Sequence, residues 1–349
     1  MIRIALIPGD GIGPDVLREA RRVLDATAAA GLAELSFKEF PHGADHYLAT
    51  GETLSEPTFA SLRDDFDAIL LGAVGDPRVP DNQHARDILL GLRLRLDLFI
   101  NFRPARLRSS RLSPLKDGER PIDFVIFREN TEGMYSAAGG TIRAGTQHEV
   151  AVSECFATRF GVERIVRAAF EYAQRTGRTR VTLGDKANAV PHVYGLWRRV
   201  FDLVAAEYPD IESEKRYVDA LAMDLVRNPE RFSVIVADNL LGDILSDLAA
   251  ELVGGMGLAP SANYNPAGGA LYEPVHGSAP DLVGTGIANP MGAILSAALL
   301  LEHAGATDAA ARVDAAVDAA LEAGVVTADL GGTNTTVEVG EWIAGRIVE

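Results

Sequence analysis

The chain is poor in cysteine, in long apolar runs and in positive charge. Its 349 residues include one cysteine, Cys155, so an intrachain disulfide and a multi-cysteine metal site are excluded. No apolar stretch reaches the roughly 18 residues that cross a membrane. The first residues, MIRIALIPGDG, do not follow a signal-peptide pattern. These absences predict a protein of the reducing cytoplasm, without a membrane partner.

The scarcity of positive charge limits the kinds of partner. Lysine and arginine total 33 against 49 acidic residues, which gives a formal net charge of −16. Such a chain is repelled by nucleic acid and by anionic membranes. It can still bind small anions, because local arginines do that. A GxGxxG motif is also lacking: GDGIGPD at 9–15 has different spacing, so a standard Rossmann site is not expected.

The apolar pattern predicts an α/β protein. At 349 residues the chain suits two domains, and 47% hydrophobic with 23% charged residues is ordinary for a globular enzyme. Strand-like runs alternate with helical spacing, which favours mainly parallel pairing. The expected strands are 2–8, 66–72, 123–127, 180–183 and 232–237, and the expected helices are 15–30, 89–99 and 304–323. Residues 139–160 alternate like an antiparallel hairpin, a kind of excursion that often serves dimerisation.

The acidic pair Asp243 and Asp247 is the most informative feature that is present. The two lie in NLLGDILSDLAAELVGG, residues 239–255. Four residues apart on a helix, their carboxylates share one face and repel each other. A divalent cation would offset that repulsion, and Mg²⁺ and Mn²⁺ prefer carboxylate oxygens. A solvated acidic face is the alternative, but Ile244 and Leu245 make this helix apolar. We therefore predict a metal site on a largely buried helix that follows a strand.

Three arginines near predicted strand or helix ends suggest how an anionic substrate is held. They are Arg93 in GLRLRLD, Arg103 in NFRPAR and Arg128 in IFRENTEGMY. Each taken singly reads as a surface charge. Guanidinium groups match carboxylates bidentately, and lysine does this less well. Together with the acidic pair, the three arginines predict a site for a polycarboxylate held on a metal.

Tyr135 and Lys186 are candidates for proton transfer, and Asp219 is a third candidate metal carboxylate. A tyrosine and a lysine in one polar site can pass a proton when neighbouring charges adjust their pKa values. A structural role for the tyrosine and lysine, and a helix cap for the aspartate, are the alternatives.

The run EPVHGSAPDLVGTGIANP, residues 273–290, has the features of a nucleotide site. Gly277, Gly284 and Gly286 let the backbone approach a ligand closely. Asp281 is placed to accept hydrogen bonds from ribose hydroxyls and would repel a 2′-phosphate. This favours NAD over NADP.

At this point the chain resembles the β-decarboxylating dehydrogenases of 2-hydroxy acids, which include isopropylmalate, isocitrate, homoisocitrate, tartrate and D-malate enzymes. The likeness covers nearly the whole length. It is carried by IPGDGIGPD, GAVGDPRVP, LFINFRPARL, RENTEGMY, DKANAV, YVDALAMDLV, DNLLGDILSDLAAELVGGMGLAPSAN, EPVHGSAPDLVGTGIANP and DLGGTNTT. The aspartate-bearing and EPVHGSAPD motifs are highly specific in combination.

The resemblance implies a two-domain fold with a mixed sheet flanked by helices. A large nucleotide-binding domain would comprise residues 1–100 and 255–349, and a small domain, 101–254, would hold the metal site and the dimer interface. Each site would be shared between the subunits of a homodimer.

By position, the substrate carboxylates would bind to Arg93, Arg103 and Arg128. The metal, Mg²⁺ or Mn²⁺, would be held by Asp243, Asp247 and Asp219 of the partner subunit. Protons would be moved by Tyr135, by Lys186 of the partner subunit, and by Asp219. NAD would contact Glu273, His276, Gly277, Asp281, Leu282 and Asn289.

Substrate choice is expected to depend on the helix before Arg93. Leu89 and Leu90 resemble the apolar pair that faces the isopropyl group in isopropylmalate enzymes, whereas homoisocitrate enzymes carry an arginine where Leu90 stands. The resemblance thus favours NAD-linked oxidative decarboxylation of 3-isopropylmalate to 4-methyl-2-oxopentanoate, a step of leucine biosynthesis. Tartrate or D-malate remains the alternative, because the corresponding helix of those enzymes also contains aliphatic residues and segments such as RENTEGMYSAAGG resemble theirs closely. Arg86 also departs from isopropylmalate enzymes, many of which have a glutamate there. A catalytically silent regulatory relative is a further alternative, but the aspartates, the lysine and the tyrosine are all present.

Overall fold

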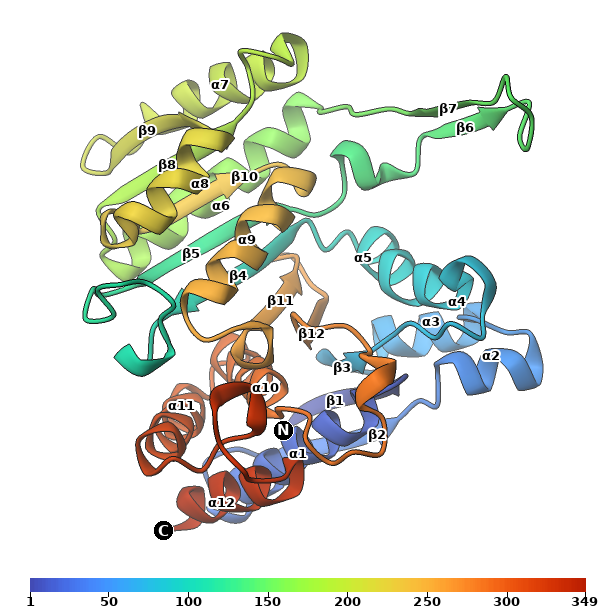
Figure 1. The fold of residues 1–349 in the computed structure, drawn as a ribbon, viewed down its shortest axis with the longest axis vertical. Helices are drawn as coiled ribbons and strands as arrows, with labels where there is room; N and C mark the ends of the chain where they lie inside the picture. The colour runs from blue at the N-terminus through green and yellow to red at the C-terminus, as the bar shows by residue number, and fades with distance from the viewer. The chain divides into compact units, whose positions relative to one another are not determined.

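The computed structural model describes residues 1–349 and divides into two compact units. Unit 1 comprises Met1–Leu98, Arg106–Glu119 and Ala250–Glu349, and unit 2 comprises Phe99–Ala105 and Arg120–Ala249. Both ends of the chain therefore belong to unit 1. The architecture is a mixed α/β one, with sheets flanked by helices (Figure 1). No helix is both long and apolar enough to cross a membrane.

Unit 1 contains five strands in the order β2-β1-β3-β12-β11. β1 pairs in parallel with β2 and β3, β3 pairs in parallel with β12, and β11 runs antiparallel to β12. The strands are β1 (Ile2–Gly9), β2 (Leu35–Glu39), β3 (Ala68–Ala73), β11 (Pro260–Tyr264) and β12 (Ala270–Pro274). The helices are α1 (Gly13–Ala29), α2 (Ala44–Thr50), α3 (Glu56–Asp64), α4 (Gln83–Ala85), α5 (Gly91–Arg95), α10 (Met291–His303), α11 (Thr307–Ala323) and α12 (Thr336–Val348).

Helices cover the sheet of unit 1 on both faces. On one face, α1 packs on β3 while α10 packs on β11 and β12. On the other, Phe59 and Leu62 of α3 join Ala5, Ile7 and Leu71 in a buried apolar cluster. β3 is buried at all six positions, which is typical of a parallel strand covered on both sides.

Unit 2 contains five strands in the order β4-β5-β10-β8-β9, and the four from β5 to β9 pair in parallel. The strands are β4 (Ile100–Arg106, whose last residue belongs to unit 1), β5 (Asp123–Glu129), β8 (Arg180–Asp185), β9 (Glu212–Tyr217) and β10 (Val234–Ala237). The helices are α6 (Arg159–Thr176), α7 (Pro191–Ala205), α8 (Val218–Arg227) and α9 (Asn239–Leu252, which ends in unit 1).

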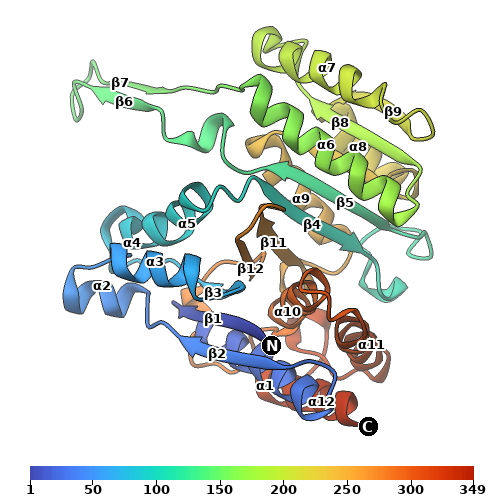
Figure 2. The ribbon, with the colours of Figure 1, turned by 180° about the vertical axis from the view of Figure 1, so that it is seen from behind.

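Two helix layers cover the sheet of unit 2. α8 and α9 lie in front of it in Figure 1, and α6 lies in front when the molecule is seen from behind in Figure 2. β6 (Gly139–Ile142) and β7 (Val150–Ser153) form an antiparallel hairpin that extends away from the body of unit 2 (Figures 1 and 2). This is the hairpin expected for residues 139–160. All eight of its strand residues are exposed.

The helix expected over 89–99 is shorter at its end and irregular at its start. A π-helical turn, Arg86–Leu90, leads into α5, which ends at Arg95. The chain then reverses at Asp97, whose φ of 49° lies in the left-handed region. That reversal allows β4 to begin at Ile100. π-Turns inside helices are often found at functional sites, and this one carries Leu89 and Leu90.

Candidate functional site

The strongest polar cluster in unit 2 is centred on Arg128, the sixth residue of β5. Its side chain is 3% exposed and bonds to Asp243 of α9. Asn239, at the start of α9, accepts hydrogen bonds from Arg128 Nε at 3.0 Å and from Nη2 at 2.7 Å. A buried guanidinium requires such partners, because an unpaired buried charge is costly. The predicted pair Arg128 and Asp243 is therefore brought together.

Gly242 on α9 makes this close approach possible. A Cβ at this position would lie 2.8 Å from both Cβ and Cγ of Arg128, which real contacts do not allow. Parallel pairing of β5 with β10 sets Arg128 beside Ala237, two residues before α9 begins. The helix thus starts next to the arginine, and only glycine leaves room for its stem.

Asp247 lies one turn further along α9 and is half-buried. Its carboxylate is 4.0 Å from Nη1 of Arg103, which comes from β4. Burial raises the pKa of Asp247, and the neighbouring charge of Asp243 adds to the rise. Both causes disfavour a second negative charge here, which is the electrostatic condition that a bound cation relieves. Arg103 is itself held by Asn101, whose Oδ1 accepts from Nε at 2.8 Å.

Tyr135 joins the same cluster from a short 3₁₀ turn, Gly133–Ser136. Its hydroxyl donates to Oδ2 of Asp243 at 3.0 Å. Partial burial raises the pKa of Tyr135, and the negative charge of Asp243 raises it further. The phenol therefore stays protonated at neutral pH and can donate a proton.

Lys186 and Asp219 form a separate pair in unit 2. Nζ of Lys186, just after β8, is 2.6 Å from Oδ1 of Asp219 on α8. This hydrogen bond lowers the pKa of Asp219. Within one chain, the pair bonds to itself and does not join the carboxylates of α9 in a metal-ligating group.

In unit 1, Arg93 lies on α5 and is paired with Glu273 of β12. Its Nη2 is 2.7 Å from Oε1 of Glu273, and both side chains are less than a tenth exposed. Asn263 of β11 donates to the same oxygen at 2.9 Å. The predicted substrate arginine and a predicted cofactor residue thus hold each other in position.

Leu89 and Leu90 are half-buried in the π-turn before α5. Their helix is fixed at its start by His84, whose Nε2 lies 2.7 Å from Oδ2 of Asp10. It is also tied by Asp87, which accepts a hydrogen bond from Thr53 at 3.0 Å. These contacts give the two leucines a fixed setting within unit 1.

The segment 273–290, predicted to bind the cofactor, already holds some of its residues in position for a ligand. Nε2 of His276 is buried without a hydrogen-bond partner, and burial lowers the pKa of this ring so that it is neutral at pH 7. Gly277 has no atom within 4 Å of the position where a Cβ would stand. Asn289 is fixed between Asp329, at 3.0 Å, and the backbone N–H of Met291. The orphaned imidazole nitrogen and the open glycine suit a ligand that brings its own polar groups.

The remaining cofactor residues lie in an open turn. Asp281 and Leu282 belong to the 3₁₀ turn Pro280–Leu282, where Asp281 is exposed and Leu282 half-buried. The following Gly284 and Gly286 both have positive φ. The exposed carboxylate is thus accessible to a ligand.

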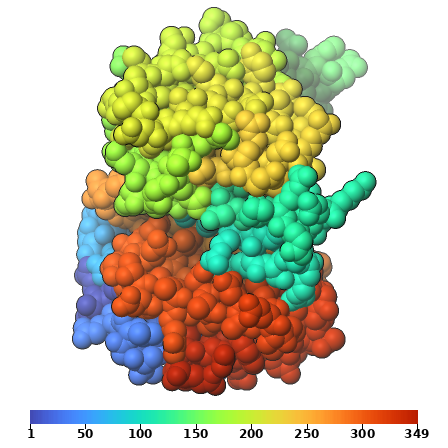
Figure 3. All heavy atoms as spheres, turned by 90° about the vertical axis from the view of Figure 1, so that its left-hand side faces the viewer, coloured from blue at the N-terminus to red at the C-terminus, as the bar shows by residue number.

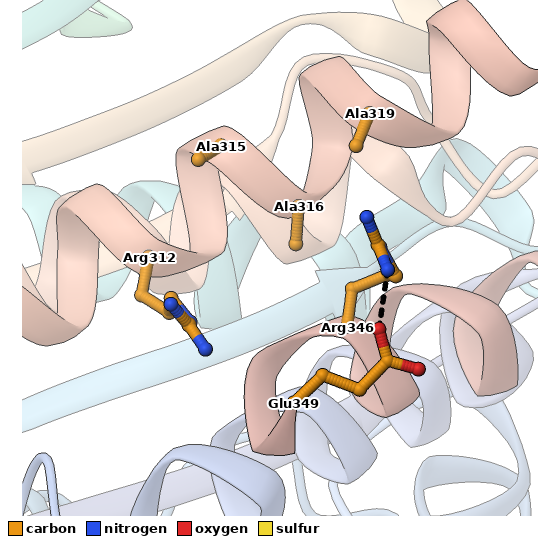
Figure 4. Close-up of a pocket in the computed structure, with 6 residues that line it drawn as sticks. All are labelled: Arg312, Ala315, Ala316, Ala319, Arg346 and Glu349. Carbon is orange, nitrogen blue, oxygen red and sulfur yellow. Dashed lines mark hydrogen bonds and ion pairs between the residues drawn. The ribbon is translucent and has the colours of Figure 1, made fainter.

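One pocket of unit 1 lies apart from all of these residues. It has a volume of about 350 Å³ and is formed by α11 and α12 (Figure 4). Its lining consists of Arg312, Ala315, Ala316, Ala319, Arg346 and Glu349. Arg346 is paired with Glu349, as Figure 4 shows, and none of the predicted site residues lines this hollow.

Sequence reasoning missed the residues that orient the arginines. Asn239 and Asn101 hold the guanidinium groups of Arg128 and Arg103. Asn239 also donates to the backbone oxygen of Glu132 at 3.1 Å, which ties α9 to the segment before Tyr135. The available signal was the placement of Asn239 directly after a buried strand, where polar residues tend to serve a site.

Comparison with known proteins places the chain among dehydrogenases. The family model "Isocitrate/isopropylmalate dehydrogenase" matches residues 3–343. A 3-isopropylmalate dehydrogenase of Streptomyces coelicolor is 47% identical over 99% of this chain and 98% of its own length. One from Nocardia farcinica is also 47% identical, over 99% of this chain and 100% of its own length.

Solved structures agree with this likeness. An isocitrate dehydrogenase from Methylococcus capsulatus superposes with a TM-score of 0.92 at 39% identity, covering 100% of both chains. A β-decarboxylating dehydrogenase from Thermococcus kodakarensis gives a TM-score of 0.80 at 39% identity, over 99% of this chain and 96% of its own. The two-domain α/β fold inferred from the sequence is thereby confirmed. The chain belongs to the isocitrate/isopropylmalate dehydrogenase family and is a decarboxylating dehydrogenase.

Proposed function

We propose that the protein catalyses the NAD-linked oxidative decarboxylation of 3-isopropylmalate to 4-methyl-2-oxopentanoate, a step of leucine biosynthesis. The cluster of Arg128, Tyr135 and Asp243, with Asp247 one turn away, is the observation that carries the proposal. It combines a carboxylate-binding arginine, a proton donor and an acidic pair on one side of α9. Relatives that are 47% identical and named for this activity support the choice of substrate.

Arginines and leucines together fit a substrate with two carboxylates and one apolar group. We assign the carboxylates to Arg93, Arg103 and Arg128, and the isopropyl group to Leu89 and Leu90. Arg103 and Arg128 are each oriented by an asparagine, so their guanidinium planes are fixed before substrate arrives. A further carboxylate against two leucines would be left unpaired, which disfavours a tricarboxylate.

The acidic pair of α9 fits Mg²⁺ or Mn²⁺, and the run 273–290 fits NAD. The cation would bind Asp243 and Asp247, with Asp219 of the partner subunit as a third ligand. For the cofactor, the unpaired Nε2 of His276 offers a hydrogen-bond acceptor or donor. The exposed carboxylate of Asp281 offers a contact to the ribose. When bound, NAD⁺ supplies the hydride acceptor, and the cation polarises the oxygen on C2 of the substrate.

The chain's own residues move the protons. Lys186 of the partner subunit, paired with Asp219, takes up the proton of the C2 hydroxyl as hydride leaves C2. Loss of CO₂ from C3 then places negative charge on the C2 oxygen and C3. Tyr135 is protonated at neutral pH, and its hydroxyl delivers the proton to C3.

Because the proposed site takes residues from two subunits, it requires a homodimer. Exposed apolar side chains on unit 2 support this assembly. α8 and α9 expose Met223, Val226 and Ile244, which are 56%, 44% and 57% exposed. The hairpin adds Ile142 and Val150, at 62% and 48%. The yellow to gold atoms of the segment that includes α8 and α9 lie at the surface in Figure 3. Exposed apolar side chains in such number are typical of a subunit interface.

The test is product stoichiometry with purified protein, 3-isopropylmalate, NAD⁺ and Mn²⁺. We expect NADH, CO₂ and 4-methyl-2-oxopentanoate in equal amounts. We expect Asp243→Asn to abolish turnover with an unchanged circular dichroism spectrum, and Asp25→Asn, on the exposed side of α1, to remain active. Turnover by Asp243→Asn near the wild-type rate would overturn the metal assignment. NADH without CO₂ would overturn decarboxylation of this substrate.

A further inference from the structure

We propose a second metal site in unit 1, formed by His42, His46 and Glu52. It would bind one divalent transition-metal ion such as Zn²⁺. These residues flank or belong to α2, and none of them was assigned a role in the reaction. One ligand atom from each lies within 4.8 Å of the others. The site is independent of the proposed substrate.

The local backbone brings the three side chains together. His42 precedes Gly43, the N-cap of α2, and His46 lies in the first turn of the helix. Gly51 ends the helix with a φ of 74°, a left-handed cap that reverses the chain. Glu52 is thereby directed back, and its N–H is held by Oγ1 of Thr50 at 3.1 Å.

His42 is buried and His46 is half-buried, and three of their four ring nitrogens are buried without a hydrogen-bond partner. Neither Nδ1 nor Nε2 of His42 has a partner, and the residue is 5% exposed. Nε2 of His46 is likewise buried and unpaired, and the two ring centroids lie 4.9 Å apart. Buried polar atoms normally make hydrogen bonds, so three ring nitrogens without hydrogen bonds on two neighbouring imidazoles need an explanation. A shared metal ion, bound by one nitrogen of each ring, accounts for two of the three.

The donor set selects the class of ion. Imidazole and carboxylate ligands suit Zn²⁺, whereas Mg²⁺ prefers oxygen alone. The neutral imidazole is the form that binds metals. A tetrahedral ion with bonds of about 2.1 Å holds its ligands about 3.4 Å apart. Glu52 is exposed, so rotation of its side chain can bring its carboxylate closer to the two imidazoles.

Such an ion would fasten both ends of α2. The segment is already tied to the rest of unit 1, because Ala44 N donates to Oδ1 of Asp10 at 2.5 Å. Asp10 in turn pairs with His84, at the start of the helix that carries Leu89 and Leu90. The site therefore acts on stability at the edge of the substrate helix and supplies no group to the reaction.

The experiment is a Zn²⁺ titration of the full-length, chelator-treated protein against a competing metal dye, with Co²⁺ absorption as a geometry readout. An Asp243→Asn/Asp247→Asn background removes the α9 site. We expect about one Zn²⁺ per chain in that background, a tetrahedral Co²⁺ spectrum, and a rise in Tm of at least about 3 °C at hundredfold excess over Kd. His46→Gln should abolish all three, while His192→Gln, an exposed histidine of unit 2, should abolish none.

Zinc binding that survives His46→Gln unchanged would overturn the proposal. So would the absence of stoichiometric binding in the background variant. Glu52→Gln tests the site independently if the histidine variant misfolds, because it changes an exposed side chain. We expect it to weaken Zn²⁺ binding at least tenfold. The result does not depend on substrate turnover, so failure here leaves the proposed reaction untouched.

Discussion

At the scale of single residues, the candidate site depends on how buried charges are compensated. Arg128 is almost fully buried, and it is tolerated because Asp243 and Asn239 satisfy it. Removing one partner of such a group leaves the other unpaired, which costs more than the bond itself contributes. The asparagine is thus a positioning residue, because it holds the arginine that we assign to substrate.

Asn239→Ala should raise KM for 3-isopropylmalate by at least about tenfold, with a smaller change in kcat. The reason is that Arg128 loses two acceptor contacts and its fixed orientation. Stability should fall by about 1–3 kcal/mol, because a buried charged donor is left unsatisfied. Steady-state kinetics and urea unfolding measure the two effects, with Asn228→Ala as an exposed control. An unchanged KM would show that Asn239 only supports the fold.

At the scale of elements, one helix is expected to determine the substrate. Leu89 and Leu90 of the π-turn Arg86–Leu90 are half-buried, whereas Leu94 of α5 is exposed. The helix is anchored at both His84 and Asp87. A change of side chain there should therefore alter selectivity without moving the element.

Leu90→Arg should lower kcat/KM for 3-isopropylmalate and admit a tricarboxylate such as homoisocitrate. A guanidinium at this position would repel the isopropyl group and pair with a third carboxylate. Leu94→Arg on the same helix is the matched control, because Leu94 is 47% exposed. If preference stays the same in Leu90→Arg, the substituent pocket has been mislocated.

A second element-scale prediction concerns the ion pairs that hold α11. Asp314 accepts from both Arg106 and Arg108, and Arg108 is 9% exposed. Burial opposes ionisation of Asp314, but the hydrogen bond and charge of Arg108 outweigh it, so the pKa of Asp314 is lowered. A carboxyl with a lowered folded-state pKa stabilises above its unfolded pKa and loses that contribution as pH falls through the folded value.

Asp314→Asn should therefore cost about 1–2 kcal/mol of stability at pH 6–8. The difference from wild type should shrink as the pH falls below about 4, because the unfolded carboxyl takes up its proton there, before the folded Asp314 does. Urea unfolding across pH 3–8 measures this, with the exposed Asp308→Asn as control. A difference that is constant down to pH 3 would contradict the assigned direction of the pKa shift.

At the scale of the whole molecule, one chain holds two separate groups of the residues that we propose to be catalytic. Tyr135 bonds to Asp243, while Lys186 bonds to Asp219. We propose that Lys186 and Asp219 of the partner subunit complete the site around Tyr135 and Asp243, so that a monomer would have no complete site. The exposed apolar side chains of α8, α9 and the hairpin are the surface that dimerisation would cover.

Subunit mixing tests this sharing. Tyr135→Phe and Lys186→Met should each be nearly inactive alone. After dissociation and random reassociation, half of the dimers are mixed, and each mixed dimer regains one intact site of two. The mixture should therefore reach about a quarter of wild-type activity. If differently tagged subunits copurify but the mixture stays inactive, both residues serve a site within one chain.

Much of the fold followed from local pattern, because period and burial are encoded along the chain. The buried strands at 2–8 and 123–127 lie where alternation with helices predicted them. The irregular start and early end of the helix expected at 89–99 did not follow, because a π-turn and a left-handed Asp97 depend on tertiary packing. The candidate residues Arg128, Tyr135 and Asp243 were found by residue type, and the structure adds their contacts. The asparagines that orient the arginines, and the histidines beside α2, required three-dimensional proximity.

The most direct test of the central claim is NADH formation at saturating NAD⁺ and Mn²⁺ with five substrates. These are 3-isopropylmalate, D-malate, tartrate, isocitrate and homoisocitrate. We predict that kcat/KM for 3-isopropylmalate exceeds each of the others by at least about tenfold, since burying three extra methyl or methine carbons is worth at least about 1.4 kcal/mol. A preference for D-malate, tartrate or a tricarboxylate would contradict the isopropyl assignment of Leu89 and Leu90.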